Sequence, residues 1–109
     1  MRIDKPWGYE KIIEKNENYV MKELFMKKGH QCSLQYHEIK HETVYILKGN
    51  LHIFYNDDWK IFHPGDSLIL QPGEIHRMKA VDEDCLYLEA STPELDDVIR
   101  IQDDFNRQD

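Results

Sequence analysis

The chain is poor in cysteine, in basic residues and in long apolar runs, and each shortage excludes a class of protein. Its 109 residues include two cysteines, Cys32 and Cys85, which form no Cys-x-x-Cys pair and no disulfide framework. We therefore expect a reducing compartment, the cytoplasm. The 21 acidic residues outnumber the 14 lysines and arginines, and the net charge of −7 argues against nucleic acid or anionic membranes as partners. No apolar run approaches a membrane span, and the start MRIDKPWGYEK has no signal-peptide core.

Several signatures of catalysis and nucleotide binding are also missing. There is no Gly-x-Ser-x-Gly elbow, no phosphate-binding glycine loop and no dinucleotide fingerprint, so nothing supports a serine hydrolase or a nucleotide-binding protein. Internal repeats, low-complexity segments and linkers are absent as well. With 40% apolar residues, the chain should form one folded domain over residues 1–109, with an N-terminal arm and a C-terminal tail.

What the chain does contain is a series of short β-prone runs separated by turn formers. Even spacing of this kind predicts an all-β sandwich or barrel. The expected strands are Tyr9–Glu14, Tyr19–Met26, Cys32–His37, Thr43–Leu47, Leu51–Tyr55, Trp59–Phe62, Ser67–Leu70, His76–Ala80 and Leu86–Ala90. Residues from Pro93 to Asp103 give a weak helical signal, and the tail after Asp103 should fray.

Four side chains have the spacing of a metal site. Gln35 and His37 are two residues apart, so they point to the same side of an extended strand. Glu42 follows across a short polar turn, and His76 comes from a distant strand. Imidazole, carboxylate and amide oxygen suit a borderline divalent cation: zinc first, with manganese, cobalt, nickel or iron as alternatives. His41 could replace His37 or Glu42, although its place in the turn favours an exposed histidine.

The same spacing resembles the two signature motifs of the cupin superfamily, which are Gly-x5-His-x-His-x3–4-Glu-x6-Gly and Gly-x5-Pro-x-Gly-x2-His. The matching positions are Gly29, Gln35, His37, Glu42, Gly49, Gly65, Gln71, Gly73 and His76. Gln35 replaces the first histidine, and Gln71 replaces the proline. The resemblance implies a single cupin barrel (a jelly roll, or double-stranded β-helix) with one divalent metal ion inside.

The whole chain also resembles the C-terminal cupin domain of type II phosphomannose isomerases, which are often fused to a GDP-mannose pyrophosphorylase. The matching segments are Lys5-Pro6-Trp7-Gly8, Ser33-Leu34-Gln35-Tyr36-His37, His76-Arg77, Glu89, Asp96-Asp97-Val98-Ile99-Arg100 and Asp104-Phe105-Asn106-Arg107. Thr43-Val44 replaces the usual His-Trp, and Asn106 replaces a glycine. The 109 residues hold no nucleotidyltransferase domain, so we expect no pyrophosphorylase activity from them.

The phosphomannose isomerase resemblance implies interconversion of mannose 6-phosphate and fructose 6-phosphate at a divalent metal. Arg100 is the first candidate to clamp a phosphate, since guanidinium matches phosphate geometry, and Arg77 is a weaker one. Lys5 and Lys22 are weaker candidates of the same kind. Glu89 is the candidate base, although the pattern leaves open whether its side of the strand lines the cavity.

The leading hypothesis is an aldose–ketose isomerase that acts on a sugar or sugar phosphate. One alternative is a non-catalytic sugar-binding or regulatory cupin, and the other is a metal-dependent dioxygenase, which Gln35 argues against because that chemistry favours several histidines. The cupin resemblance further implies a homodimer, in which exposed strand edges become covered.

Overall fold

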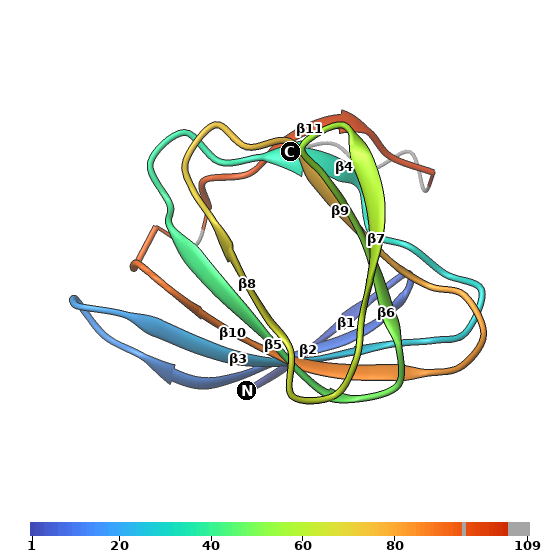
Figure 1. The fold of residues 1–109 in the computed structure, drawn as a ribbon. Helices are drawn as coiled ribbons and strands as arrows, with labels where there is room; N and C mark the ends of the chain where they lie inside the picture. Colours follow the sequence, from blue (N-terminus) through green and yellow to red (C-terminus); the bar gives the residue numbers. More distant parts are fainter. Residues whose placement is uncertain (95, 105–109) are drawn as a thin grey trace.

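Two antiparallel sheets form a β-sandwich that closes into a barrel (Figure 1). The computed structural model describes residues 1–94 and 96–104. The first sheet contains, in spatial order, β1 (Arg2–Lys5), β2 (Gly8–Lys15), β3 (Val20–Met26), β10 (Cys85–Ser91), β5 (Glu42–Lys48) and β8 (Ser67–Leu70). The second contains β11 (Ile99–Gln102), β4 (Leu34–Tyr36), β9 (His76–Ala80), β6 (Leu51–Tyr55) and β7 (Asp58–Phe62).

The core lies between the two sheets, where every second residue of each central strand points inward. On β5, Val44 and Ile46 are fully buried, whereas Tyr45 between them is exposed. Leu51 and Ile53 of β6 meet them from the facing sheet. Because Glu42 and His76 have the same inward orientation, the period-two alternation also brings these two polar side chains into the interior.

The sheet topology confirms the all-β cupin-type barrel and corrects two details at its margins. All nine expected strands are present, with bounds that agree within a few residues. The sequence patterns missed β1 and β11, and the helical signal from Pro93 to Asp103 is wrong. Ile99 and Arg100 instead pair with Tyr36 and Gln35 of β4, because this segment satisfies its backbone by joining a sheet edge.

Two limits of the described chain bear on the predictions. The last matching segment, from Phe105 to Arg107, lies outside the described residues. Within residues 1–94 and 96–104, no helix is long and apolar enough to cross a membrane.

Candidate metal centre and cavity

His37, Glu42 and His76 converge at one end of the barrel interior. The His37 Nε2 atom lies 3.0 Å from Glu42 Oε1, and His76 Nε2 lies 3.5 Å from the same oxygen. One potential ligand atom from each residue lies within 4.8 Å of the others, and all three side chains are at most 2% exposed. His37 directly follows β4, Glu42 begins β5 and His76 begins β9, so the residues that the motif spacing singled out lie together.

The outer ring nitrogens of both histidines are held by backbone carbonyls. His37 Nδ1 lies 2.5 Å from the Asp97 carbonyl oxygen, and His76 Nδ1 lies 3.0 Å from that of Glu74. A carbonyl can only accept, so each Nδ1 carries a proton, and each Nε2 faces Glu42. The Glu42 carboxylate and the two Nε2 atoms therefore face one another, an arrangement that a cation or a shared proton stabilises.

The protonation states and the unpaired atoms of the triad fit a divalent metal. Burial alone would raise the pKa of Glu42, but the hydrogen bond with His37 and the charge of Lys40 lower it to about 2. Burial lowers the pKa of His76, so its ring is neutral near pH 7. Glu42 Oε2 and His76 Nε2 are buried without a hydrogen-bond partner in the described part of the chain. Ionised carboxylate and neutral imidazole are the forms that bind metal.

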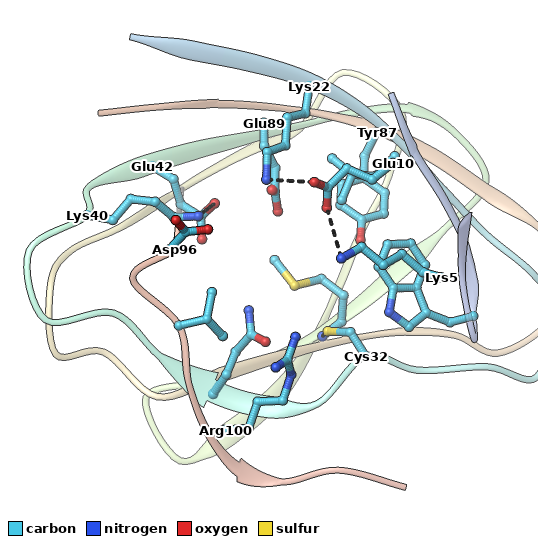
Figure 2. Close-up of a pocket in the computed structure, with 15 residues that line it drawn as sticks. Lys5, Glu10, Lys22, Cys32, Lys40, Glu42, Tyr87, Glu89, Asp96 and Arg100 are labelled. Atoms are coloured by element: carbon cyan, nitrogen blue, oxygen red, sulfur yellow. Dashed lines mark hydrogen bonds and ion pairs between the residues drawn. The ribbon is translucent and has the colours of Figure 1, made fainter. Parts of the chain in front are cut away.

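A cavity of about 470 Å³ adjoins the triad, and Glu42 belongs to the triad and also lines the cavity (Figure 2). Its apolar wall comprises Trp7, Leu24, Met78 and Val98. The charged groups that line it are Lys5, Lys22, Lys40, Arg100, Glu10, Glu42, Glu89 and Asp96. In a chain with net charge −7, four basic side chains therefore gather around this one space beside four acidic ones. A lining of polar groups beside one apolar wall is typical of a small-molecule site.

An ion-pair cluster forms one wall of the cavity. Lys22 Nζ lies 3.0 Å from Glu10 Oε1, and Lys5 Nζ lies 4.0 Å from Glu10 Oε2 (Figure 2). Lys22 shares the inward face of β3 with Val20 and Leu24, and it is only 7% exposed. A lysine in an apolar row is costly to bury without a partner, so Glu10 stabilises it here.

The carboxyl group of Glu89 lies in the same cavity, beside Lys22 (Figure 2). The structure places Cys85, Tyr87 and Glu89 on the inner face of β10, which the sequence left open. Burial, reinforced by the negative charge of Glu42, raises the pKa of Glu89 to about 8. Glu89 therefore exchanges a proton near neutral pH, as a general acid–base group must.

The two candidate arginines have different surroundings. Arg100 on β11 lines the cavity across from Glu89 (Figure 2). Arg77 alternates away from His76, is 7% exposed, and donates a 2.8 Å hydrogen bond from Nε to the Cys32 carbonyl oxygen. Its Nη2 lies 3.3 Å from Asp104. Arg77 thus binds backbone carbonyl groups outside the cavity, and it is not among the described residues that line the cavity.

Gln35 lines the cavity and pairs with His76 in the register of β4 and β9. Its Oε1 accepts a 2.6 Å hydrogen bond from Ser33 Oγ, and an amide oxygen retains a second lone pair. His41 is half-buried, forms hydrogen bonds with Thr92 through its backbone and does not join the triad.

Sequence reasoning missed three polar groups of the site: Glu10, Lys40 and Asp96. Lys40 is 3% exposed and lies 4.0 Å from Glu42 Oε2, which places a positive charge beside the triad. Its position between two metal-ligand positions, His37 and Glu42, was the available signal. Glu10 and Asp96 carried no such signal, since their place in the cavity depends on strand pairing and on the C-terminal segment.

Comparison with known proteins identifies the family. The family model described as "Cupin domain" matches residues 22–91. The mannose-1-phosphate guanylyltransferase ManC of Salmonella typhimurium is 27% identical over 109 residues, which cover 96% of this chain and 23% of the relative. The mannose-1-phosphate guanylyltransferase of Sinorhizobium fredii is 28% identical over 108 residues, which cover 95% of this chain and 21% of the relative. The chain thus spans less than a quarter of these relatives, and the resemblance to their cupin region is confirmed.

Solved structures show the same fold at lower identity. KdgF from a Halomonas species superposes with a TM-score of 0.81 at 19% identity and covers 89% of both chains. The capsular polysaccharide assembling protein CapF of Staphylococcus aureus gives 0.80 at 16% identity, over 94% of this chain and 34% of the other. At these identities the likeness concerns the fold alone. Taken with the family match and the two motifs, it shows that the chain belongs to the cupin family.

Proposed function

We propose that this cupin is a metal-dependent aldose–ketose isomerase of the mannose-6-phosphate isomerase type, acting on a sugar or sugar phosphate. The observation that carries the proposal is the position of Glu89, a carboxyl group with a pKa of about 8, in one cavity with the ligand Glu42. Relatives named as mannose-1-phosphate guanylyltransferases support sugar-phosphate chemistry.

In this proposal His37, Glu42 and His76 hold one divalent ion, and Gln35 is the fourth protein ligand. Zinc is the first choice, and manganese, cobalt, nickel and iron are the alternatives, because imidazole, carboxylate and amide donors suit them all. When bound, such an ion supplies Lewis acidity that polarises substrate oxygens.

The protein's own groups would position the substrate and move the proton. Arg100 binds the phosphate or another anionic group, with the Lys22–Glu10 pair on the opposite wall to orient hydroxyl groups. Ionised Glu89 takes a proton from the carbon beside the carbonyl and returns it to the former carbonyl carbon. The hydroxyl proton of the first carbon passes to the former carbonyl oxygen, so Glu89 ends in its starting state. The apolar wall of Trp7 and Met78 limits the water that competes for this proton.

The test is a screen of metal-free protein reloaded with each candidate metal, against mannose 6-phosphate, fructose 6-phosphate, other hexose phosphates and free sugars. Incubation in deuterium oxide should place deuterium on the carbon that receives the proton. Glu89→Gln should lower turnover by about 10²–10⁴-fold while substrate still binds, since it removes only the proton carrier. Binding without turnover or deuterium exchange would favour a non-catalytic sugar-binding cupin, and oxygen uptake by the iron-loaded protein would favour a dioxygenase.

We propose that Gln35 tunes the metal toward this chemistry. A neutral amide oxygen donates less electron density than imidazole, so the ion stays a harder Lewis acid for substrate oxygens. Gln35→His should retain or tighten metal binding yet lower isomerase turnover, whereas Gln35→Ala should weaken both. Equal turnover by Gln35→His and the parent protein would remove this role from Gln35.

A further inference from the structure

One residue of the C-terminal segment, Asp97, binds the loop that separates two of the proposed metal ligands. Its carboxylate accepts hydrogen bonds from the backbone amides of Glu38 (3.0 Å), Ile39 (2.7 Å) and Lys40 (2.8 Å). Its backbone carbonyl accepts a fourth hydrogen bond, from His37 Nδ1 (2.5 Å). A single residue therefore contacts every residue from position 37 to position 40.

These contacts act directly on the backbone and the ring that shape the triad. Three consecutive amides that point at one carboxylate form a concave nest, which fixes the backbone between His37 and Glu42. The bond to His37 Nδ1 fixes the rotation of that ring and the nitrogen that carries its proton. The neighbouring pairing of Arg100 with Gln35 holds Asp97 in register beside the loop.

We propose that Asp97 is a positioning residue for the metal centre: it holds the His37–Glu42 loop in the conformation that binds the ion. The inference rests on the proposed metal site and adds to it that the C-terminal segment, which lies far away in sequence, sets the metal affinity. It follows that metal binding and the contacts of Asp97 with the loop are coupled, and coupling of this kind is reciprocal.

The first test compares Asp97→Asn with a matched control, Asp66→Asn. Asp66 also accepts a hydrogen bond from a backbone amide in a turn, that of His63 at 2.8 Å, but in the connection between β7 and β8. Asp97→Asn should weaken zinc affinity about 10–100-fold, and it should change the visible absorption of bound cobalt(II), which reports coordination geometry. Asp66→Asn should lower stability without changing zinc affinity or the cobalt spectrum. Parental zinc affinity and an unchanged cobalt spectrum in Asp97→Asn would overturn the proposal.

The second test uses the parent protein and does not depend on the folding of a variant. Hydrogen exchange of the Glu38, Ile39 and Lys40 amides is measured with and without zinc. Coupling predicts at least several-fold slower exchange at these amides when zinc is bound, with no such change at the His63 amide. Equal exchange at the three amides in the presence of bound zinc would contradict the role of Asp97. If the parent protein binds neither zinc nor cobalt, the metal site itself is wrong, which is a distinct result.

Discussion

Replacement of Glu89 by glutamine should make metal-free protein more stable at alkaline pH. The pKa of Glu89 is raised from 4.5 to about 8 in the folded protein, so the folded state holds this proton more tightly than the unfolded chain does. The stability associated with Glu89 is therefore complete below about pH 4.5 and is lost as the pH rises through about 8. Glutamine has nearly the shape of the protonated carboxyl and never ionises, so the variant escapes this loss.

The size of the effect follows from the pKa difference. Each pKa unit corresponds to about 1.4 kcal/mol, and Glu89 is partly exposed to the cavity, where water and salt weaken the penalty. We therefore expect Glu89→Gln to gain about 2 kcal/mol over the parent between about pH 5 and about pH 9. Groups common to both proteins cancel in this difference.

Urea unfolding of the two EDTA-treated proteins across this pH range gives the free energies of unfolding. Glu17→Gln, which alters an exposed glutamate before β3, serves as the control and should run parallel to the parent. A difference in the free energy of unfolding between Glu89→Gln and the parent that stays constant with pH would refute the reasoning. It would mean that folding does not raise the pKa of Glu89.

Three further predictions concern the scaffold. Gly8→Ala should lower the free energy of unfolding by more than about 2 kcal/mol, because an added Cβ would lie 1.9 Å from the Phe25 carbonyl oxygen. Gly65→Ala should lower it by about 1 kcal/mol, because its Cβ meets no atom within 4 Å and only the positive φ is unfavourable. Urea unfolding of both variants shows whether Gly8→Ala loses more free energy of unfolding than Gly65→Ala. Arg77→Ala should lower the free energy of unfolding by about 1–3 kcal/mol through its lost bond to the backbone, yet leave substrate KM unchanged, unlike Arg100→Ala. Light scattering should give a homodimer of twice 13.1 kDa, and a mass near that of one chain at micromolar concentration would contradict it.

Much of the fold could be predicted because strand periodicity is a local property. Apolar alternation located the strands Leu51–Tyr55, Ser67–Leu70 and His76–Ala80 with their observed bounds. The strands Arg2–Lys5 and Ile99–Gln102 escaped because each is a four-residue strand at a sheet edge, without a fully buried residue, and so is too short to give a clear periodic signal.

The candidate metal residues were predictable because each motif fixes its offsets within a few residues, and the barrel then brings His37, Glu42 and His76 together. The rest of the site depends on contacts that no local pattern encodes. Glu89 required the orientation of β10, and the role of Asp97 required partners 57 to 60 residues away in the chain.

The most direct test of the central claim is elemental analysis of protein purified without a histidine tag. The account predicts one divalent metal ion per parent chain, and loss of that ion in His37→Ala and in His76→Ala, each of which removes one imidazole. His63→Ala, which removes an exposed histidine from the connection between β7 and β8, should retain the metal. Circular dichroism shows whether each variant keeps its β-structure. Full metal content in folded His37→Ala and folded His76→Ala would contradict the assignment of the metal centre.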